Sequence, residues 1–138
     1  MQKRINVALI VFSDKDGRIL LNKRADADVE SWELIGGGIE KSETPLEAIK
    51  REVFEEVGYE IDKNYDKLLD LCSFSYSSPS LLANVWAFSA TNPGIEHFTD
   101  SEEAFAKDLK LFSIDEALKL NLLPMTRIVF DKIKRKKL

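Results

Sequence analysis

Apolar residues in the sequence are grouped into short runs that are typical of β-strands. Ile5–Phe12 is such a run, and Arg18–Asn22 is a second, shorter one. The polar segment between them, Ser13–Gly17, has the composition of a hairpin turn. Two later runs, Leu68–Tyr76 and Leu81–Ala90, are also predicted strands. In the second of these, both alternating faces are largely apolar, which indicates a central strand covered on both sides.

One amphipathic helix is predicted between the two pairs of strands. Thr44 suits the N-cap, Pro45 suits the first helical position, and Glu47 completes a capping box. Gly58 can adopt the left-handed conformation that ends a helix. Apolar residues at spacings of three and four predict one core-facing stripe. Its expected members are Leu46, Ile49, Val53 and Val57.

The C-terminal part of the chain is predicted to add a strand and two helices. Leu109–Phe112 is the last expected strand, and Ser113 with Glu116 forms a second capping box, opening a helix to about Leu120. An amphipathic helix follows Pro124. Its expected core residues are Met125, Ile128, Val129 and Ile133. This order of elements predicts a layered α/β domain.

Composition narrows the class of protein. The chain has 138 residues and is 44% hydrophobic, which predicts one compact domain over residues 1–138. A net charge of −4 argues against a general nucleic-acid binder, so no stable nucleic-acid partner is expected. Cys72 is the only cysteine, which excludes an internal disulfide and favours a cytoplasmic location. No apolar segment is long enough for a signal peptide or membrane span, so no membrane partner is expected either.

The predicted helix carries an unusual group of carboxylates near its C-terminal end. Glu52, Glu55 and Glu56 share one arc of the helix, where they repel one another and oppose the helix dipole. A positive ion is therefore expected on this face, and hard oxygen ligands favour Mg²⁺, with Mn²⁺ as a substitute. The Gly36–Gly38 segment, expected to be a loop, would let backbone approach the ion. From the helix alone, a solvated charged face after an ordinary glycine-rich turn remains the alternative.

The spacing of these residues resembles the Nudix box, G-x5-E-x7-R-E-U-x-E-E-x-G-U, in which U is a bulky apolar residue. Gly37 occupies the first glycine position, Glu43 the lone glutamate, and Arg51–Tyr59 the remainder, with the final tyrosine as a looser match. Ile35 departs from the family's usual proline, and a looser loop is expected there. The resemblance implies a Nudix-type α/β/α sandwich with a mixed β-sheet.

The resemblance also implies roles for individual residues. The magnesium site would be formed by Gly37, through its carbonyl, Glu52, Glu55 and Glu56. Arg51 would hold a catalytic glutamate by a charge-assisted hydrogen bond, and Glu43 would tie the loop to the helix through Arg51. Either Glu52 or Glu56 would accept the proton of the attacking water.

Members of this family often add a glutamate from a loop near the C-terminal part of the sheet. Glu102 and Glu103, which precede the last predicted strand, are the candidates here, and Glu96 is a weaker one. A solvated loop is the alternative interpretation of these residues.

The implied activity is metal-dependent hydrolysis of a pyrophosphate bond in a nucleoside diphosphate derivative, releasing a nucleoside monophosphate. A nucleoside triphosphate, a dinucleoside polyphosphate or a nucleotide sugar would serve as substrate, and a homodimer is possible. The alternative is a non-catalytic module that senses nucleotides. Isoprenyl diphosphate isomerisation, found in one branch of the superfamily, needs a reactive cysteine and is disfavoured because Cys72 lies in a predicted strand. Phe74, Tyr76 and Trp86 could stack on a base, although core positions are favoured for all three.

Overall fold

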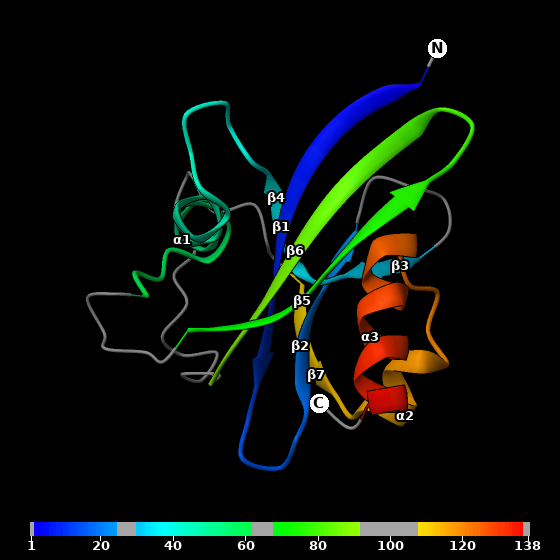
Figure 1. The fold of residues 1–138 in the computed structure, drawn as a ribbon. Helices are drawn as coiled ribbons and strands as arrows, with labels where there is room; N and C mark the ends of the chain where they lie inside the picture. The colour runs from blue at the N-terminus through cyan, green and yellow to red at the C-terminus, as the bar shows by residue number, and fades with distance from the viewer. Residues whose placement is uncertain (1, 25–29, 62–67, 92–107, 137–138) are drawn as a thin grey trace.

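The computed structural model describes residues 2–24, 30–61, 68–91 and 108–136. Seven strands and three helices lie in these ranges, and Figure 1 shows their arrangement. The strands are β1 (Lys3–Ser13), β2 (Ile19–Arg24), β3 (Ser31–Glu33), β4 (Ile35–Gly38), β5 (Leu69–Ser77), β6 (Leu81–Thr91) and β7 (Leu109–Phe112). The helices are α1 (Pro45–Val57), α2 (Ile114–Leu118) and α3 (Pro124–Lys136). None of the helices in these ranges has the length and apolar character needed to span a membrane.

The strands form a mixed sheet in the order β3-β2-β1-β6-β5. Strands β1 and β6 run parallel, from the pair Lys3–Leu81 to the pair Ser13–Thr91, and the other pairs are antiparallel. Strand β1 pairs with β2 only next to their hairpin, and its middle pairs with β4 instead. The sheet therefore opens between β1 and β2, and β4 lies in the opening.

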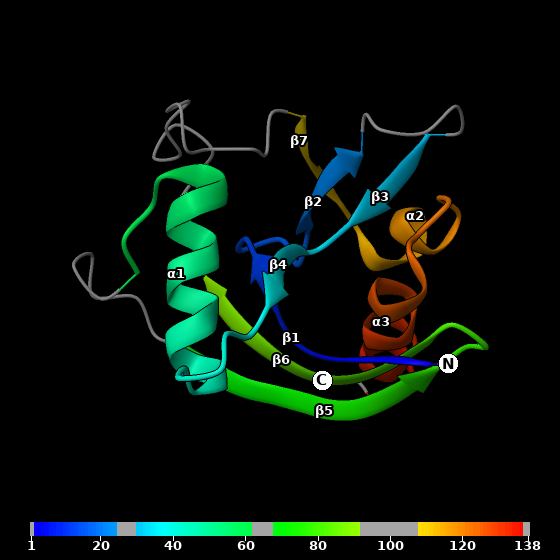
Figure 2. The same cartoon turned by 90° about the horizontal axis from the view of Figure 1, so that it is seen from above.

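Helix α1 lies on one side of the sheet, and α2 and α3 lie on the other (Figures 1 and 2). Each side has its own apolar core, and β1 contributes alternate residues to both. On the α1 side the core includes Ile10, Phe12 and Val53. On the α3 side it includes Leu9 and Phe130. The predicted α/β/α layers, the mixed sheet and the two-sided central strand β6 are confirmed.

The predicted ends of α1 are confirmed in detail. The Glu47 amide donates to Thr44 Oγ1 at 3.1 Å, and the Thr44 amide donates to Glu47 Oε1 at 2.9 Å. Gly58 ends the helix with a φ of 69°, in the left-handed region. The second capping box, at the start of α2, is also present.

Three details of the sequence-based prediction were wrong. Leu46 is 42% exposed, and Ala48 takes its place beside Ile49, Val53 and Val57 on the buried face of α1. Residues 36–38 are the end of strand β4 rather than a loop, and Ile35, expected to loosen it, is 1% exposed in the core. In α3, Ile128 is only partly buried, whereas Phe130 is fully buried.

Candidate active site

Strand β4 runs along α1, and its glycines bring backbone close to two carboxylates. The Gly36 amide donates to Glu56 Oε2 at 2.8 Å. At the next residue, a Cβ added to Gly37 would lie 2.7 Å from the Glu52 carboxylate. Any side chain at position 37 would therefore displace Glu52, and only glycine allows this approach.

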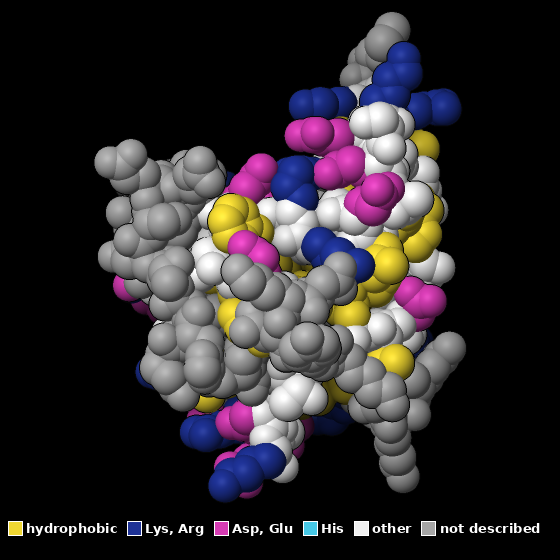
Figure 3. All heavy atoms as spheres, turned by 90° about the vertical axis from the view of Figure 1, so that its left-hand side faces the viewer, with side chains coloured by type: hydrophobic (Ala, Val, Ile, Leu, Met, Phe, Trp, Pro, Cys, Tyr) yellow, Lys and Arg dark blue, Asp and Glu magenta, His cyan; other side chains and the backbone are white. Residues whose placement is uncertain are grey.

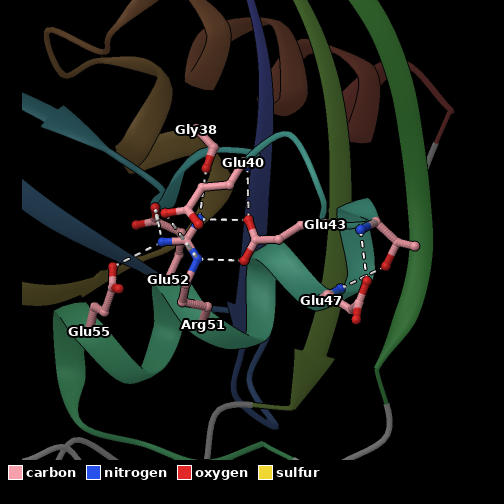
Figure 4. A network of polar contacts seen from close by, with 8 residues as sticks. Gly38, Glu40, Glu43, Glu47, Arg51, Glu52 and Glu55 are labelled. Atoms are coloured by element: carbon pink, nitrogen blue, oxygen red, sulfur yellow. Dashed lines mark hydrogen bonds and ion pairs between the residues drawn. The ribbon is translucent and has the colours of Figure 1, made fainter.

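Arg51 is the centre of the polar network at this site (Figure 4). Its guanidinium binds both oxygens of Glu43, with Nε–Oε2 at 2.6 Å and Nη2–Oε1 at 2.9 Å. Nη1 donates to Glu52 Oε1 and to Glu55 Oε2, each at 3.0 Å, and Nη2 donates to the Gly38 carbonyl at 2.9 Å. The expected link from Glu43 to the helix through Arg51 is thus present. Arg51 thus binds three of the four glutamates of the box, Glu43 before the helix and Glu52 and Glu55 within it.

The electrostatics of the site disfavour an isolated negative charge. Burial raises the pKa of Glu56 to about 8, with the Gly36 hydrogen bond acting in the opposite direction. The charges of Glu52, Glu33 and Glu55 raise it further. Burial also raises the pKa of Glu52, although the hydrogen bond from Arg51 opposes this. On the surface that carries α1, acidic side chains are interspersed with lysine and arginine (Figure 3).

The structure brings some of the predicted site residues together. Glu52 and Glu56 both contact β4. Within the described ranges, no three acidic, histidine or cysteine side chains already converge as a metal-binding group, because Arg51 and Gly36 hold the carboxylate oxygens. The predicted loop residues Glu102 and Glu103, and the weaker candidate Glu96, lie outside the described residues.

Glu33 was missed as a site residue by the sequence analysis. It is in register with Asn22 of β2, its Oε1 lies 3.5 Å from Arg24 Nη1, and its charge reaches Glu56. The sequence analysis did not predict the three-residue strand β3. The side of the sheet that the Glu33 side chain faces could therefore not be assigned. The apolar Trp32 and Leu34 on either side of Glu33 show the alternation that could have identified it.

The aromatic candidates are partly buried and pack against the two cores. Phe74 and Tyr76 pack against the apolar cluster on the α3 side, away from α1, and so does Cys72. Trp86 packs against the cluster on the α1 side and is partly buried. The favoured interpretation of the first two as core residues agrees with these positions.

Comparison with known proteins shows which family has this arrangement. The family model described as NUDIX domain matches residues 2–132. The chain belongs to the NUDIX domain family. The expected family and its fold are thereby confirmed.

Sequence relatives and a solved structure agree with this assignment. An RNA pyrophosphohydrolase of Halorhodospira halophila is 53% identical over 55 residues, which are 40% of this chain and 29% of that protein. One of Rickettsia prowazekii is 29% identical over 133 residues, or 86% of this chain and 80% of that protein. The chain thus spans less than a third of the first relative and four-fifths of the second. The structure of the E. coli dihydroneopterin triphosphate pyrophosphohydrolase has a TM-score of 0.76 and 22% identity, and each chain is 99% covered.

Proposed function

We propose that this Nudix protein is a magnesium-dependent pyrophosphohydrolase of a nucleoside diphosphate derivative, with a nucleoside triphosphate as the first candidate substrate. The relatives named above are pyrophosphohydrolases of RNA and of a pterin triphosphate, which supports cleavage of a pyrophosphate bond. The proposal treats residues 1–138 as one catalytic domain. A cytoplasmic location and a homodimer stay predictions.

The observation that carries the proposal is the contact of Glu52 and Glu56 with the glycines of β4. Both carboxyls have raised pKa values, so a cation between them would stabilise their ionised forms. The available donors are carboxylate oxygens and, at Gly37, a backbone carbonyl. This all-oxygen set fits Mg²⁺ and also Mn²⁺.

In this proposal, Glu52, Glu55, Glu56 and the Gly37 carbonyl would hold the magnesium ion. When bound, the ion would neutralise diphosphate charge and lower the pKa of a water molecule. In the reaction, the oxygen of a water molecule would bond to phosphorus while the bridging P–O bond breaks, so that a nucleoside monophosphate and, from a nucleoside triphosphate, pyrophosphate would be released. Glu52 or Glu56 accepts the proton of the water, and Arg51 positions Glu52 for either role.

The other activities considered receive less support. Cys72 packs against the apolar cluster on the α3 side, so it does not face α1 as an isomerase cysteine in this site would. A nucleotide-sensing module would bind nucleotides without turnover, and the experiment below distinguishes it from the enzyme.

The test is a screen of nucleoside triphosphates, dinucleoside polyphosphates and nucleotide sugars with Mg²⁺ or Mn²⁺, read out by phosphate detection after phosphatase coupling. We expect turnover by the wild type, and a loss of about a hundredfold or more in Glu56→Gln. Glu55→Gln tests whether that carboxylate shares the metal. Glu47→Gln is the matched control, because it is the same change on the same helix and glutamine preserves the capping box.

Turnover in the wild type and Glu47→Gln, but not in Glu56→Gln, would support the enzyme. Tight nucleotide binding with no turnover of any substrate would instead favour the sensing module. Equal turnover in all variants would remove Glu56 from the catalytic machinery.

A further inference from the structure

Asn22 is a buried polar residue whose side-chain oxygen has no hydrogen bond from any residue that the structure describes. Its relative exposure is 9%, and its Oδ1 atom is the one fully buried side-chain polar atom in the described ranges that has no hydrogen bond. Leaving such an acceptor unsatisfied costs about 1–3 kcal/mol. The preceding residues of β2, Ile19–Leu21, are apolar and buried. Stability alone would favour an apolar residue here as well.

The register of the sheet places Asn22 on the side of α1. Along β2, Leu20 belongs to the core on the α1 side, and Leu21 belongs to the core on the α3 side. Alternation therefore directs Asn22 to the α1 side. Its partner on β7, Leu109, packs against the same α1-side core, and residues in register across neighbouring strands share a face.

Asn22 is also in register with an acidic residue that interacts electrostatically with Glu56. Its partner on β3 is Glu33, whose charge contributes to the raised pKa of Glu56. Figure 2 shows β2, β3 and β7 together at one end of the molecule. An unsatisfied acceptor thus lies on the same side of the sheet as α1, in register with Glu33.

The chemistry of Oδ1 limits what can bind there. An amide oxygen only accepts hydrogen bonds, and phosphate oxygens at neutral pH also only accept them, so the phosphates of a substrate do not satisfy it. The neighbouring carboxylate of Glu33 repels them further. Within a nucleotide, only the nucleoside part can therefore supply the donor, and the apolar side chain of Leu109 beside Asn22 suits a flat base.

We propose that Asn22 is a specificity-determining residue whose Oδ1 accepts a hydrogen bond from the amino group of the substrate's base. The side-chain amide presents an acceptor beside a donor, which matches a base edge with an amino group next to a ring nitrogen, as in adenine. The inference rests on the proposed function, because it places a nucleoside in the site formed by α1 and β4. Such a hydrogen bond would favour bases with an amino group, adenine and cytosine, over their counterparts with an oxo group at the same position, hypoxanthine and uracil.

The test compares substrates that differ only in this group: adenine with hypoxanthine nucleotides, and cytosine with uracil nucleotides. We expect the wild type to prefer the amino member of at least one pair by about tenfold or more in kcat/KM. Asn22→Leu is expected to abolish most of that preference by raising KM for the amino substrate. Asn22→Val, a second apolar variant that favours strands, serves if the leucine variant does not fold.

The matched control is Asn84→Leu on β6. The Asn84 amide already accepts from Ser75 Oγ at 2.9 Å and donates to Asn6 Oδ1 at 3.3 Å, so no ligand is needed to satisfy it. This variant is expected to keep the substrate preference of the wild type.

A binding measurement separates this inference from the proposed function. Calorimetry in EDTA uses the monophosphates of both pairs, AMP with IMP and CMP with UMP. The wild type is expected to bind the amino member of at least one pair more tightly, and the Asn22 variants are expected to show no difference within that pair. Failure of the wild type to hydrolyse any nucleotide would refute the proposed function and leave this binding test intact. The inference is overturned by an unchanged amino preference in the Asn22 variants. It is also overturned if they change only ribose-against-deoxyribose selection, or only thermal stability.

Discussion

Arg51 spans two elements with one guanidinium group. It contacts Glu43 before α1, the Gly38 carbonyl of β4, and Glu52 and Glu55 within the helix. Its pKa lies above the ordinary value, chiefly because of the hydrogen bonds with Glu43. A planar fork of donors can satisfy these acceptors together, whereas a lysine ammonium cannot. The position therefore requires arginine rather than positive charge alone.

Arg51→Lys should consequently lower kcat by about 10–100-fold, because Glu52 loses its fixed position. It should also lower the free energy of unfolding by about 1–2 kcal/mol, measured by urea denaturation. Arg127→Lys is the control, since the Arg127 guanidinium donates to the Leu118 and Leu120 carbonyls on the α3 side, away from α1 and β4. If kcat is unchanged in Arg51→Lys, a positive charge at this position is sufficient to position Glu52 for catalysis.

Neighbouring glycines of β4 provide a second test at the residue scale. A Cβ at Gly37 meets only the flexible end of Glu52, whereas a Cβ at Gly38 meets nothing within 4 Å. Gly37→Ala should reduce kcat/KM by about tenfold or more, with a change in unfolding free energy below about 1 kcal/mol, and Gly38→Ala should resemble the wild type. Steady-state kinetics with chemical denaturation measures both. Equal activity in the two variants would show that Glu52 has no required position against β4.

At the scale of elements, α1 was predictable from the sequence and β4 was not. The signals of α1 are local: Thr44 and Glu47 cap its start, and Gly58 ends it. Strand β4 contains three glycines, which have low strand propensity, and it exists because β1 pairs with it across more than twenty residues of sequence. The box carboxylates could therefore be placed on a helix, but their contacts with β4 could not be foreseen.

Gly36 is expected to contribute to the stability of the fold as well as to the active site. It has a φ of 151°, and an added Cβ would lie 2.1 Å from the Ala8 carbonyl oxygen of β1. Backbone cannot move aside as a side chain can, so Gly36→Ala should destabilise the protein by more than about 2 kcal/mol. Thermal or urea unfolding checks this against Gly38→Ala. If Gly36→Ala unfolds at the same midpoint as the wild type, β4 does not depend on its close approach to β1.

At the scale of the whole molecule, the layered fold followed from the box resemblance and the order of elements, whereas the opening between β1 and β2 did not. That opening depends on where β1 changes partner from β2 to β4, which hydrophobic alternation does not specify. The pairing of Asn22 with Glu33 was missed for the same reason, since it depends on the register between β2 and β3.

The buried carboxyl of Glu56 should reduce the stability of the metal-free protein. Its pKa is raised from an ordinary value of 4.5 to about 8 in the folded state, so the unfolded chain ionises first as pH rises. The folded state therefore loses relative stability between about pH 4.5 and pH 8. In EDTA, Glu56→Gln should raise the unfolding temperature by a few degrees at pH 8 and by little at pH 5, measured by scanning calorimetry. A Glu56→Gln protein less stable than the wild type at pH 8 would contradict this.

The most direct measurement is calorimetric titration of Mg²⁺ or Mn²⁺ into the purified wild type, Glu47→Gln and Glu56→Gln. If the carboxylates beside β4 form the metal site, the first two proteins bind the ion with equal affinity and Glu56→Gln binds it about tenfold or more weakly. Binding that is absent from the wild type, or equal in all three proteins, would contradict the metal site on which the proposed hydrolysis depends.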